Sequence, residues 1–161
     1  MKKYKVFFIG LLFIAPSFIL GAEFNLVSNG NVSVGNDFFV TLSLNTKEIV
    51  NAVEGRLTFP IDLLEVKEIK SGNSIINFWV NEPTVDSPGG ISFSGITPGG
   101  FKGDKNIIFS VVFIAKKNGS GTVSLSSIKS LLNDGNGTEQ KVTSNKLEFV
   151  VNAEFLENKD V

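Results

Sequence analysis

The sequence contains no cysteine and no histidine, and its 161 residues include one tryptophan, one tyrosine and one arginine. Without cysteine the chain has no thiolate nucleophile and no disulfide. Without histidine it lacks the side chain that most often acts as a general base or metal ligand near neutral pH. The composition therefore disfavours the commonest forms of nucleophilic and metal-assisted catalysis.

Residues 1–22 have the features of a secretory signal peptide. Three lysines precede an apolar run over residues 6–20, and the small residue Ala22 ends the segment. We expect cleavage after Ala22, so that the mature chain starts at Glu23. The alternative is an uncleaved amino-terminal anchor, and only in that case would the chain be held at a membrane.

The mature chain, 23–161, is long enough for one domain with a core that needs no disulfides. The leader contains three of the 15 basic residues and none of the 16 acidic ones, so the mature chain has a net charge of about −4. This charge disfavours non-specific binding to nucleic acids or anionic membranes.

Residues 51–59, NAVEGRLTF, show the clearest strand pattern. Apolar positions alternate with Glu54, Arg56 and Thr58, as in a strand with one buried face. A second short strand is expected at 63–66. The residues predicted to pack inward from these two strands are Val53, Leu57, Phe59, Leu64 and Val66.

Short segments of the same kind, separated by turn residues, continue along the chain. They are residues 24–27, 32–34, 38–45, 75–80, 91–94, 107–115, 122–126 and 146–151. Residues 97–104 are expected to form a loop, a short helix at 127–132 is left open, and residues 153–161 are expected to be a flexible tail. About nine strands and no long helical period predict an all-β sandwich, with a nine-stranded jelly roll as its closed version.

Several motifs occur in a characteristic order. They are VSVGNDFFVTLSLNT, NAVEGRLTFPIDLLEVKEI, SIINFWVNEP, GGISFSGI, IIFSVVFIAKKNGSGTVSLSS and LLNDGNGTE. Their order and spacing resemble a bacterial cohesin domain over about residues 26–151. The resemblance implies a jelly-roll sandwich at residues 23–152, secreted or at the bacterial cell surface. It also implies a non-catalytic role in binding dockerin modules, often in assemblies that degrade polysaccharides. An adhesion or structural module of the cell surface is an alternative.

The resemblance further implies that the dockerin-binding face is one sheet, formed here by residues 51–59, 75–82, 91–96 and 122–127. The predicted partner-binding residues on this face are Glu54, Arg56, Thr58, Ser92, Ser94 and Ser124. The alternative interpretation is that they are the ordinary solvated half of an alternating pattern.

Glycan binding is a second hypothesis, because cohesins share their fold with several carbohydrate-binding modules. Trp79 and Phe101 could stack on a sugar ring, with Asn77 on the same strand face as Trp79. This requires Ile76, Phe78 and Val80 to fill the core instead. The alternative is that Trp79 closes the edge of the core beneath the glycine-rich loop that carries Phe101.

The sequence gives only weak support for a metal site and for catalytic activity. Asp134 and Asn136 offer oxygen ligands to a calcium ion, but the loop lacks EF-hand spacing and Asp-Gly and Asn-Gly are common turn formers. Glycoside hydrolysis needs two facing carboxylates, and the sequence pairs none of its candidates. These candidates are Glu54, Glu82, Asp86 and Asp104. We therefore expect no enzyme and no required cofactor.

Overall fold

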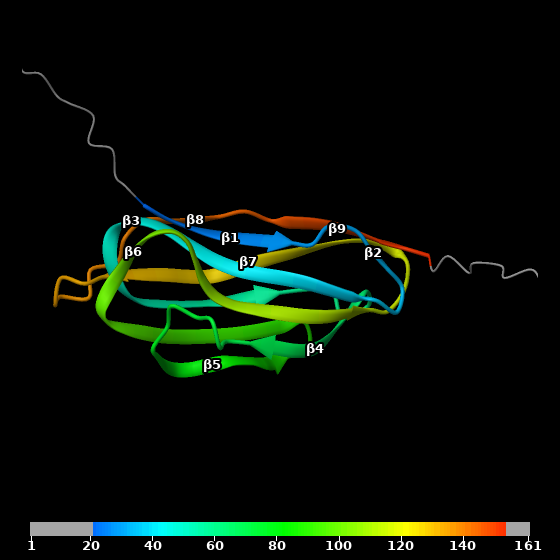
Figure 1. Ribbon diagram of the computed structural model, residues 1–161, viewed down its shortest axis with the longest axis horizontal. Helices are drawn as coiled ribbons and strands as arrows, with labels where there is room; N and C mark the ends of the chain where they lie inside the picture. Colours follow the sequence, from blue (N-terminus) through cyan, green and yellow to red (C-terminus); the bar gives the residue numbers. More distant parts are fainter. Residues whose placement is uncertain (1–20, 154–161) are drawn as a thin grey trace, which may run out of the picture.

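The computed structural model describes residues 21–153, which form nine strands and no helix. The strands are β1 (Ala22–Ser28), β2 (Val32–Ser33), β3 (Asp37–Thr58), β4 (Leu64–Lys70), β5 (Phe78–Ser87), β6 (Gly90–Ala115), β7 (Gly119–Leu132), β8 (Val142–Ser144) and β9 (Leu147–Asn152). Figure 1 shows them as an elongated sandwich, with the two ends of the described chain at opposite ends of its long axis. The predicted all-β, nine-stranded jelly-roll sandwich is confirmed.

Two long strands, β3 and β6, organise the sandwich. They pair antiparallel almost from end to end, from Asp37 opposite Ile114 to Thr58 opposite Gly90. The register shifts several times between Leu42 and Ala52, and such irregularities bend a strand pair. Each strand therefore contributes one half to each layer of the sandwich.

The first layer, called here the β5 face, consists of β5, the first part of β6, the second part of β3 and the second part of β7. The second layer, called here the β4 face, consists of β4, the last part of β6, the first part of β3, β1 and β8. Strand β9 pairs with the first part of β7 and with β2. Figure 1 shows β5 and β4 on the side of the sandwich away from β1, β8 and β9.

Three sequence predictions differ from the observed strands. Residues 97–104, expected to be a loop, lie within β6, where the glycines 99, 100 and 103 have positive φ angles. Residues 127–132, left open as a helix, belong to β7. The strand expected at residues 75–80 is instead β5, which begins at Phe78 and continues to Ser87. It passes through Pro83, which is buried where the register of this edge strand shifts between Asn81 and Thr84. In each case, pairing with a long neighbouring strand overrides the local turn or helix signal.

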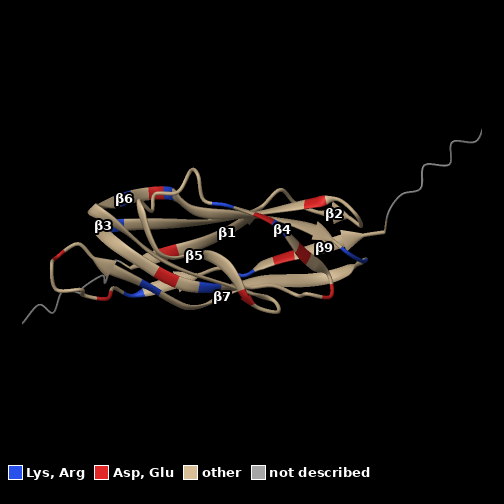
Figure 2. Ribbon diagram, turned by 90° about the horizontal axis from the view of Figure 1, so that it is seen from below, with Lys and Arg blue, Asp and Glu red and all other residues tan. Residues whose placement is uncertain are grey.

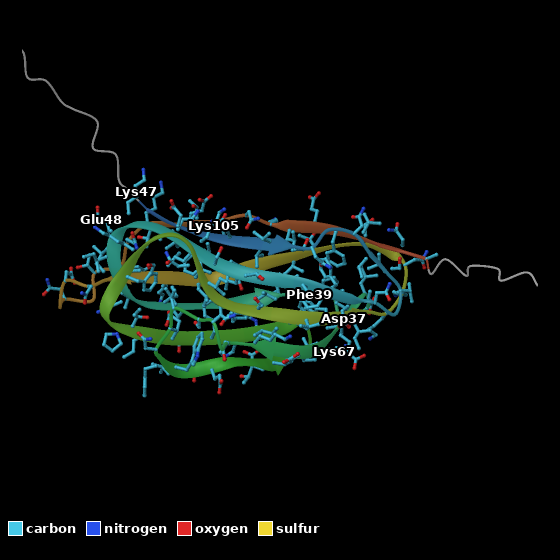
Figure 3. All side chains as sticks on the ribbon, viewed as in Figure 1. Asp37, Phe39, Lys47, Glu48, Lys67 and Lys105 are labelled. Carbon is cyan, nitrogen blue, oxygen red and sulfur yellow. The ribbon has the colours of Figure 1, made fainter. Side chains whose placement is uncertain are left out.

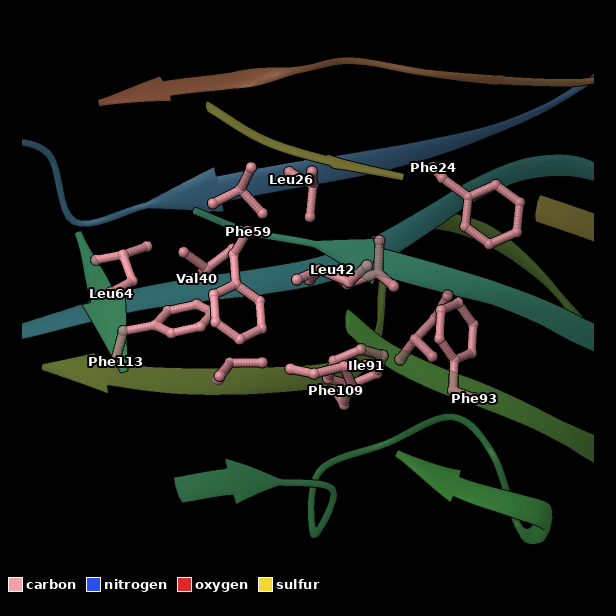
Figure 4. Packing of buried hydrophobic residues seen from close by; sticks show 14 of the residues in the cluster. Phe24, Leu26, Val40, Leu42, Phe59, Leu64, Ile91, Phe93, Phe109 and Phe113 are labelled. Atoms are coloured by element: carbon pink, nitrogen blue, oxygen red, sulfur yellow. The ribbon is translucent and has the colours of Figure 1, made fainter. Parts of the chain in front are cut away.

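Phenylalanine rings form much of the core between the layers. The ring centroids of Phe38 and Phe149 are 4.9 Å apart, as are those of Phe59 and Phe113. Figure 4 shows Phe59 and Phe113 at one end of the core and Phe93 at the other, with Leu42 and Phe109 between them. Of the residues predicted to pack inward, Val53, Leu57, Phe59 and Leu64 are buried and Val66 is half-buried against the core.

The start of the described chain is fixed to the domain. Ala22 is buried in β1, and its backbone N–H donates a hydrogen bond of 2.9 Å to the carbonyl oxygen of Lys141. The expected cleavage point after Ala22 falls inside β1, directly after its first residue. The rest of the predicted signal peptide, 1–20, and almost all of the predicted tail, 154–161, lie outside the described residues. Within residues 21–153, no helix has the length and apolar character needed to span a bilayer.

The side chain of Asn145 replaces strand pairing beside β1. Its Oδ1 accepts a hydrogen bond of 2.8 Å from the N–H of Leu26, and its Nδ2 donates one of 2.9 Å to the carbonyl oxygen of the same residue. Leu26 is a core residue, so its backbone groups are poorly accessible to water. Asn145 therefore satisfies both backbone groups of Leu26 where β8 ends.

We predict that Asn145→Ala lowers the free energy of unfolding by about 1–3 kcal/mol, because it leaves the N–H and C=O of Leu26 without these partners. Chemical denaturation would measure the change. Asn118→Ala, in the exposed turn between β6 and β7, is the matched control and should have little effect. Equal stability of the two variants would contradict the structural role of Asn145.

Candidate functional site

The outward side chains of the β5 face form four rows across its four strands. They alternate with buried residues because successive side chains of a strand point to opposite sides. From β5 to β7, the cross-strand partners give the rows Phe78–Ile96–Ala52–Leu131, Asn81–Ser94–Glu54–Lys129, Thr84–Ser92–Arg56–Ser126 and Ser87–Gly90–Thr58–Ser124. The face thus consists of one apolar row followed by three polar rows.

Arg56, in the third row, is held by a cluster of polar side chains from β5 and β6. It forms an ion pair with Asp86, its Nη1 donates to the Oγ of Ser92 at 3.0 Å, and its Nη2 donates to Ser87. Ser92 also donates to Asp86. The guanidinium lies over Gly90, where an added Cβ would collide with Nη2. Glycine at position 90 therefore makes room for the arginine that joins β3 to the β5–β6 hairpin.

The remaining polar rows are also paired internally. The Nζ of Lys129 lies 2.8 Å from Oε1 of Glu54, and the hydroxyls of Thr58 and Ser124 are 2.8 Å apart. The Glu54 carboxylate raises the pKa of Lys129. Hydrogen bonds from Ser92 and Arg56 lower the pKa of Asp86. Lys129 and Asp86 therefore stay charged, and the hydroxyls of Thr58 and Ser124 are hydrogen-bonded to each other, before any ligand binds.

All six predicted partner-binding residues lie on the outer side of this one face. These are Glu54, Arg56, Thr58, Ser92, Ser94 and Ser124. The sequence alone did not indicate that most of them contact one another. The acidic residues considered for glycoside hydrolysis are likewise engaged in part: Asp86 pairs with Arg56 and Glu54 with Lys129.

The apolar row was missed by the sequence reasoning. The glycan hypothesis required Ile76, Phe78 and Val80 to fill the core, but only Ile76 is buried, whereas Phe78 is 60% and Val80 62% exposed. Strand β5 begins at Phe78, so the alternation does not continue from Ile76. Instead Trp79 is opposite Gly95 on the inner side, and an added Cβ on Gly95 would be 3.0 Å from its ring.

A hollow of about 260 Å³ lies beside the apolar row. Its walls include Ala52, Val80, Ile96 and Leu131, and its rim includes Lys129 with Glu54 and Glu139. Ile96 is 38% exposed. Residues of both the apolar row and the second row therefore line the hollow.

The residues of the glycan hypothesis do not form an exposed platform. Trp79 and Phe101 are half-buried and pack against the core, while Asn77 is exposed. Phe78 and Val80 do not fill the core as this hypothesis requires, and the half-buried position of Trp79 agrees with the alternative, in which Trp79 lies at the edge of the core. Phe78 is more exposed than either Trp79 or Phe101.

The calcium candidates lie in the exposed turn between β7 and β8. Oδ1 of Asp134 accepts a hydrogen bond of 2.9 Å from the N–H of Asn136, and hydrogen bonds from Thr138 and this N–H lower the pKa of Asp134. This is the arrangement of an Asx turn. Within residues 21–153, no three acidic side chains come together closely enough to hold a metal ion.

The β4 face also carries an exposed aromatic side chain, Phe39. Figure 3 shows Phe39 near Asp37 and Lys67, and the Nζ of Lys67 is 2.9 Å from Oδ2 of Asp37. Phe39 is 42% exposed. Figure 2 shows positive and negative residues interspersed over the strands, so charge alone does not distinguish one face.

Solved structures with the same fold are cohesin modules. A non-cellulosomal cohesin from the hyperthermophilic archaeon Archaeoglobus fulgidus superposes with a TM-score of 0.70 at 21% identity, over 82% of this chain and 91% of that one. The cohesin module of a family 33 glycoside hydrolase from Clostridium perfringens gives 0.71 at 17% identity, over 84% and 99%. The Coh-OlpC–Doc435 complex from Clostridium thermocellum, a type I cohesin–dockerin complex, gives 0.69 at 9% identity, over 84% and 96%.

No family model matches the sequence, and no curated protein matches it. Because the sequence identities to these structures are low, the structural similarity establishes the fold alone. The chain therefore has the fold of cohesin modules, the fold that the sequence motifs indicated.

We predict that the Arg56 cluster contributes a pH-dependent part of the stability. Because the pKa of folded Asp86 is below its ordinary value of 3.8, its contribution is present above that value and is lost as the pH falls through the folded pKa. Asp86→Asn should be less stable than the wild type at about pH 7, and the gap should narrow between about pH 5 and about pH 2. Denaturant titrations across this range would measure the gap.

The control is Glu65→Gln, an exposed carboxylate on β4 that lies on the other face. The difference in unfolding free energy between Glu65→Gln and the wild type should not narrow on acidification as it does for Asp86→Asn. A gap for Asp86→Asn that stays constant on acidification would contradict the coupling of Asp86 to Arg56 and Ser92.

Proposed function

We propose that this domain is a non-catalytic binding module whose β5 face binds a dockerin-type module of another protein. The observation that carries the proposal is the composition of this face: a row of apolar side chains spans all four strands, and polar residues border it on one side. Apolar centres bordered by polar side chains are typical of specific protein–protein interfaces.

The structural relatives support this assignment. One of them is a Coh-OlpC–Doc435 complex and another is a Coh-OlpA–Doc918 complex, both of them type I cohesin–dockerin complexes. Fold similarity does not by itself carry function to this chain. The exposed Phe78, Val80 and Ile96 supply the local reason, because large apolar side chains gathered on one surface indicate an interaction site.

A binding role also agrees with the state of the acidic residues on the face. Asp86 forms an ion pair with Arg56 and Glu54 forms one with Lys129. Hydrogen bonds lower the pKa of Asp86 and so keep it ionised. A general acid for glycoside hydrolysis needs the opposite, a carboxyl group with a raised pKa. This arrangement favours binding over catalysis.

We place the module outside the cell or on its surface, within assemblies of polysaccharide-degrading or cell-surface proteins. The signal-peptide features of residues 1–22 support this location. Glycan binding through Trp79, Phe101 and Asn77, calcium binding at Asp134 and Asn136, and an adhesion role without a dockerin stay predictions. The packing of both aromatic rings against the core gives the glycan hypothesis less support than the dockerin hypothesis.

The test is to express the dockerin modules encoded in the source genome and to measure their binding to the domain by calorimetry. At least one should bind the wild type, and Ile96→Asp should weaken it at least about 30-fold, because a charge would be placed in the centre of an apolar contact. Thr41→Asp, on the β4 face, is the control and should bind normally. A genome without dockerins, or equal binding by Ile96→Asp, would overturn the proposal.

A further inference from the structure

The hollow on the β5 face exists because one small residue stands between larger ones. Ala52 occupies the β3 position of the apolar row, between Ile96 on β6 and Leu131 on β7. Val80 closes the side towards β5. A methyl group at position 52 leaves space that a longer side chain would fill. The depth of the hollow therefore depends on a single side chain whose backbone is fixed by two neighbouring strands.

The hollow is small and open on one side, so it suits a side chain of a partner better than a whole ligand. It measures about 260 Å³, whereas sites for drug-sized ligands measure roughly 300–1,000 Å³. Its walls are mainly aliphatic, so the group that enters should also be aliphatic. A leucine, isoleucine or methionine side chain fulfils both requirements.

The rim of the hollow carries an excess of negative charge. Lys129 is paired with Glu54 at 2.8 Å, and Glu139 is close enough to contribute to the raised pKa of Lys129. Two carboxylates thus lie beside one ammonium group. A positive charge next to the entering aliphatic group would balance the second carboxylate.

Several side chains of the polar rows are already hydrogen-bonded within the domain, so fewer of their donors and acceptors are available to a partner. Arg56 already binds Asp86, Ser87 and Ser92, and Thr58 is hydrogen-bonded to Ser124. A partner gains little net energy by exchanging such bonds for its own. Removal of apolar surface from water at the hollow is the larger available source of binding energy.

The spacing of the apolar row matches a helix laid across the strands. Neighbouring strands are about 4.8 Å apart, so the four positions span about 14 Å. A helix of roughly ten residues covers this length at about 1.5 Å per residue, and its side chains at i, i+3 or i+4, and i+7 recur about every 5–6 Å. One face of a short amphipathic helix can therefore contact the whole row.

We propose that the hollow at Ala52 is the specificity pocket of the domain. It takes one leucine-, isoleucine- or methionine-sized side chain from an amphipathic helix of the dockerin-type partner, and a lysine or arginine of that helix pairs with Glu139 at the rim. The identity of the helix as part of a dockerin rests on the proposed function. The chemistry of the pocket depends only on this chain.

The pocket is tested first without a protein partner. The probe is 3-methylbutan-1-amine, which combines a leucine-like group with a cation, and its uncharged analogue is 3-methylbutan-1-ol. In NMR titrations, both should shift the signals of Ala52, Ile96 and Leu131. The amine should bind about two- to five-fold more tightly than the alcohol, as expected for an exposed ion pair, and Glu139→Gln should remove this preference while Glu148→Gln on β9 keeps it.

Ala52→Leu is the variant that fills the pocket. It should abolish the amine-induced shifts, whereas Ser126→Leu, which adds a similar group to β7 two rows away, should leave them intact. Thermal melts would verify that both variants are folded. Shifts that are absent from the three pocket residues in the wild type, or that persist in Ala52→Leu, would overturn the pocket.

The partner assignment is tested with the dockerin modules that bind the wild type. Ala52→Leu should weaken them at least tenfold and Ser126→Leu much less. Equal binding by Ala52→Leu would overturn the specificity role while the dockerin-binding function stands. Amine binding in the absence of any dockerin binding would instead overturn the proposed function and the assignment of the helix to a dockerin.

Discussion

The antiparallel pairing of β3 with β6 is the constraint on which the rest of this structure depends. Because the two strands stay paired from Asp37 and Ile114 to Thr58 and Gly90, each layer of the sandwich is built on one half of the same pair. The pairing fixes which side chains share a row, and it places Ala52 beside Ile96 and Arg56 beside Ser92. A shift of one strand by one residue would turn all of the outward side chains of that strand inward. The candidate site is therefore a direct product of the fold.

The β5 face has two kinds of surface, a polar cluster and an apolar row. The cluster around Arg56 joins β3 to the β5–β6 hairpin, and it holds the outward residues of these strands in fixed positions. The apolar row, with Ile96 near its centre, offers surface that gains free energy when a partner covers it. Rigid polar support beside an uncovered apolar row is an arrangement suited to recognition, since little conformational freedom is lost on binding.

The fold could be predicted from the sequence because alternation is a strong signal wherever one side of a strand is buried. Residues 51–59 gave the correct inward set, and Val53, Leu57 and Phe59 are in the core. The position of Phe78 could not be predicted, because the alternation restarts where β5 begins and this depends on pairing with β6. The contacts of Arg56 were equally inaccessible, since Asp86 lies 30 residues away in the sequence.

Pro83 has a consequence for how this protein can associate. An edge strand exposes backbone groups to which another extended chain can pair, and such pairing leads to polymers and amyloid. In β5, a proline without an N–H lies where the strand register is interrupted between Asn81 and Thr84. Growth of the sheet beyond β5 is therefore opposed, and copies of the domain are hindered from pairing through this edge. The edge beside the apolar row is thus protected against strand addition, while the outward side chains of the row stay accessible to a partner.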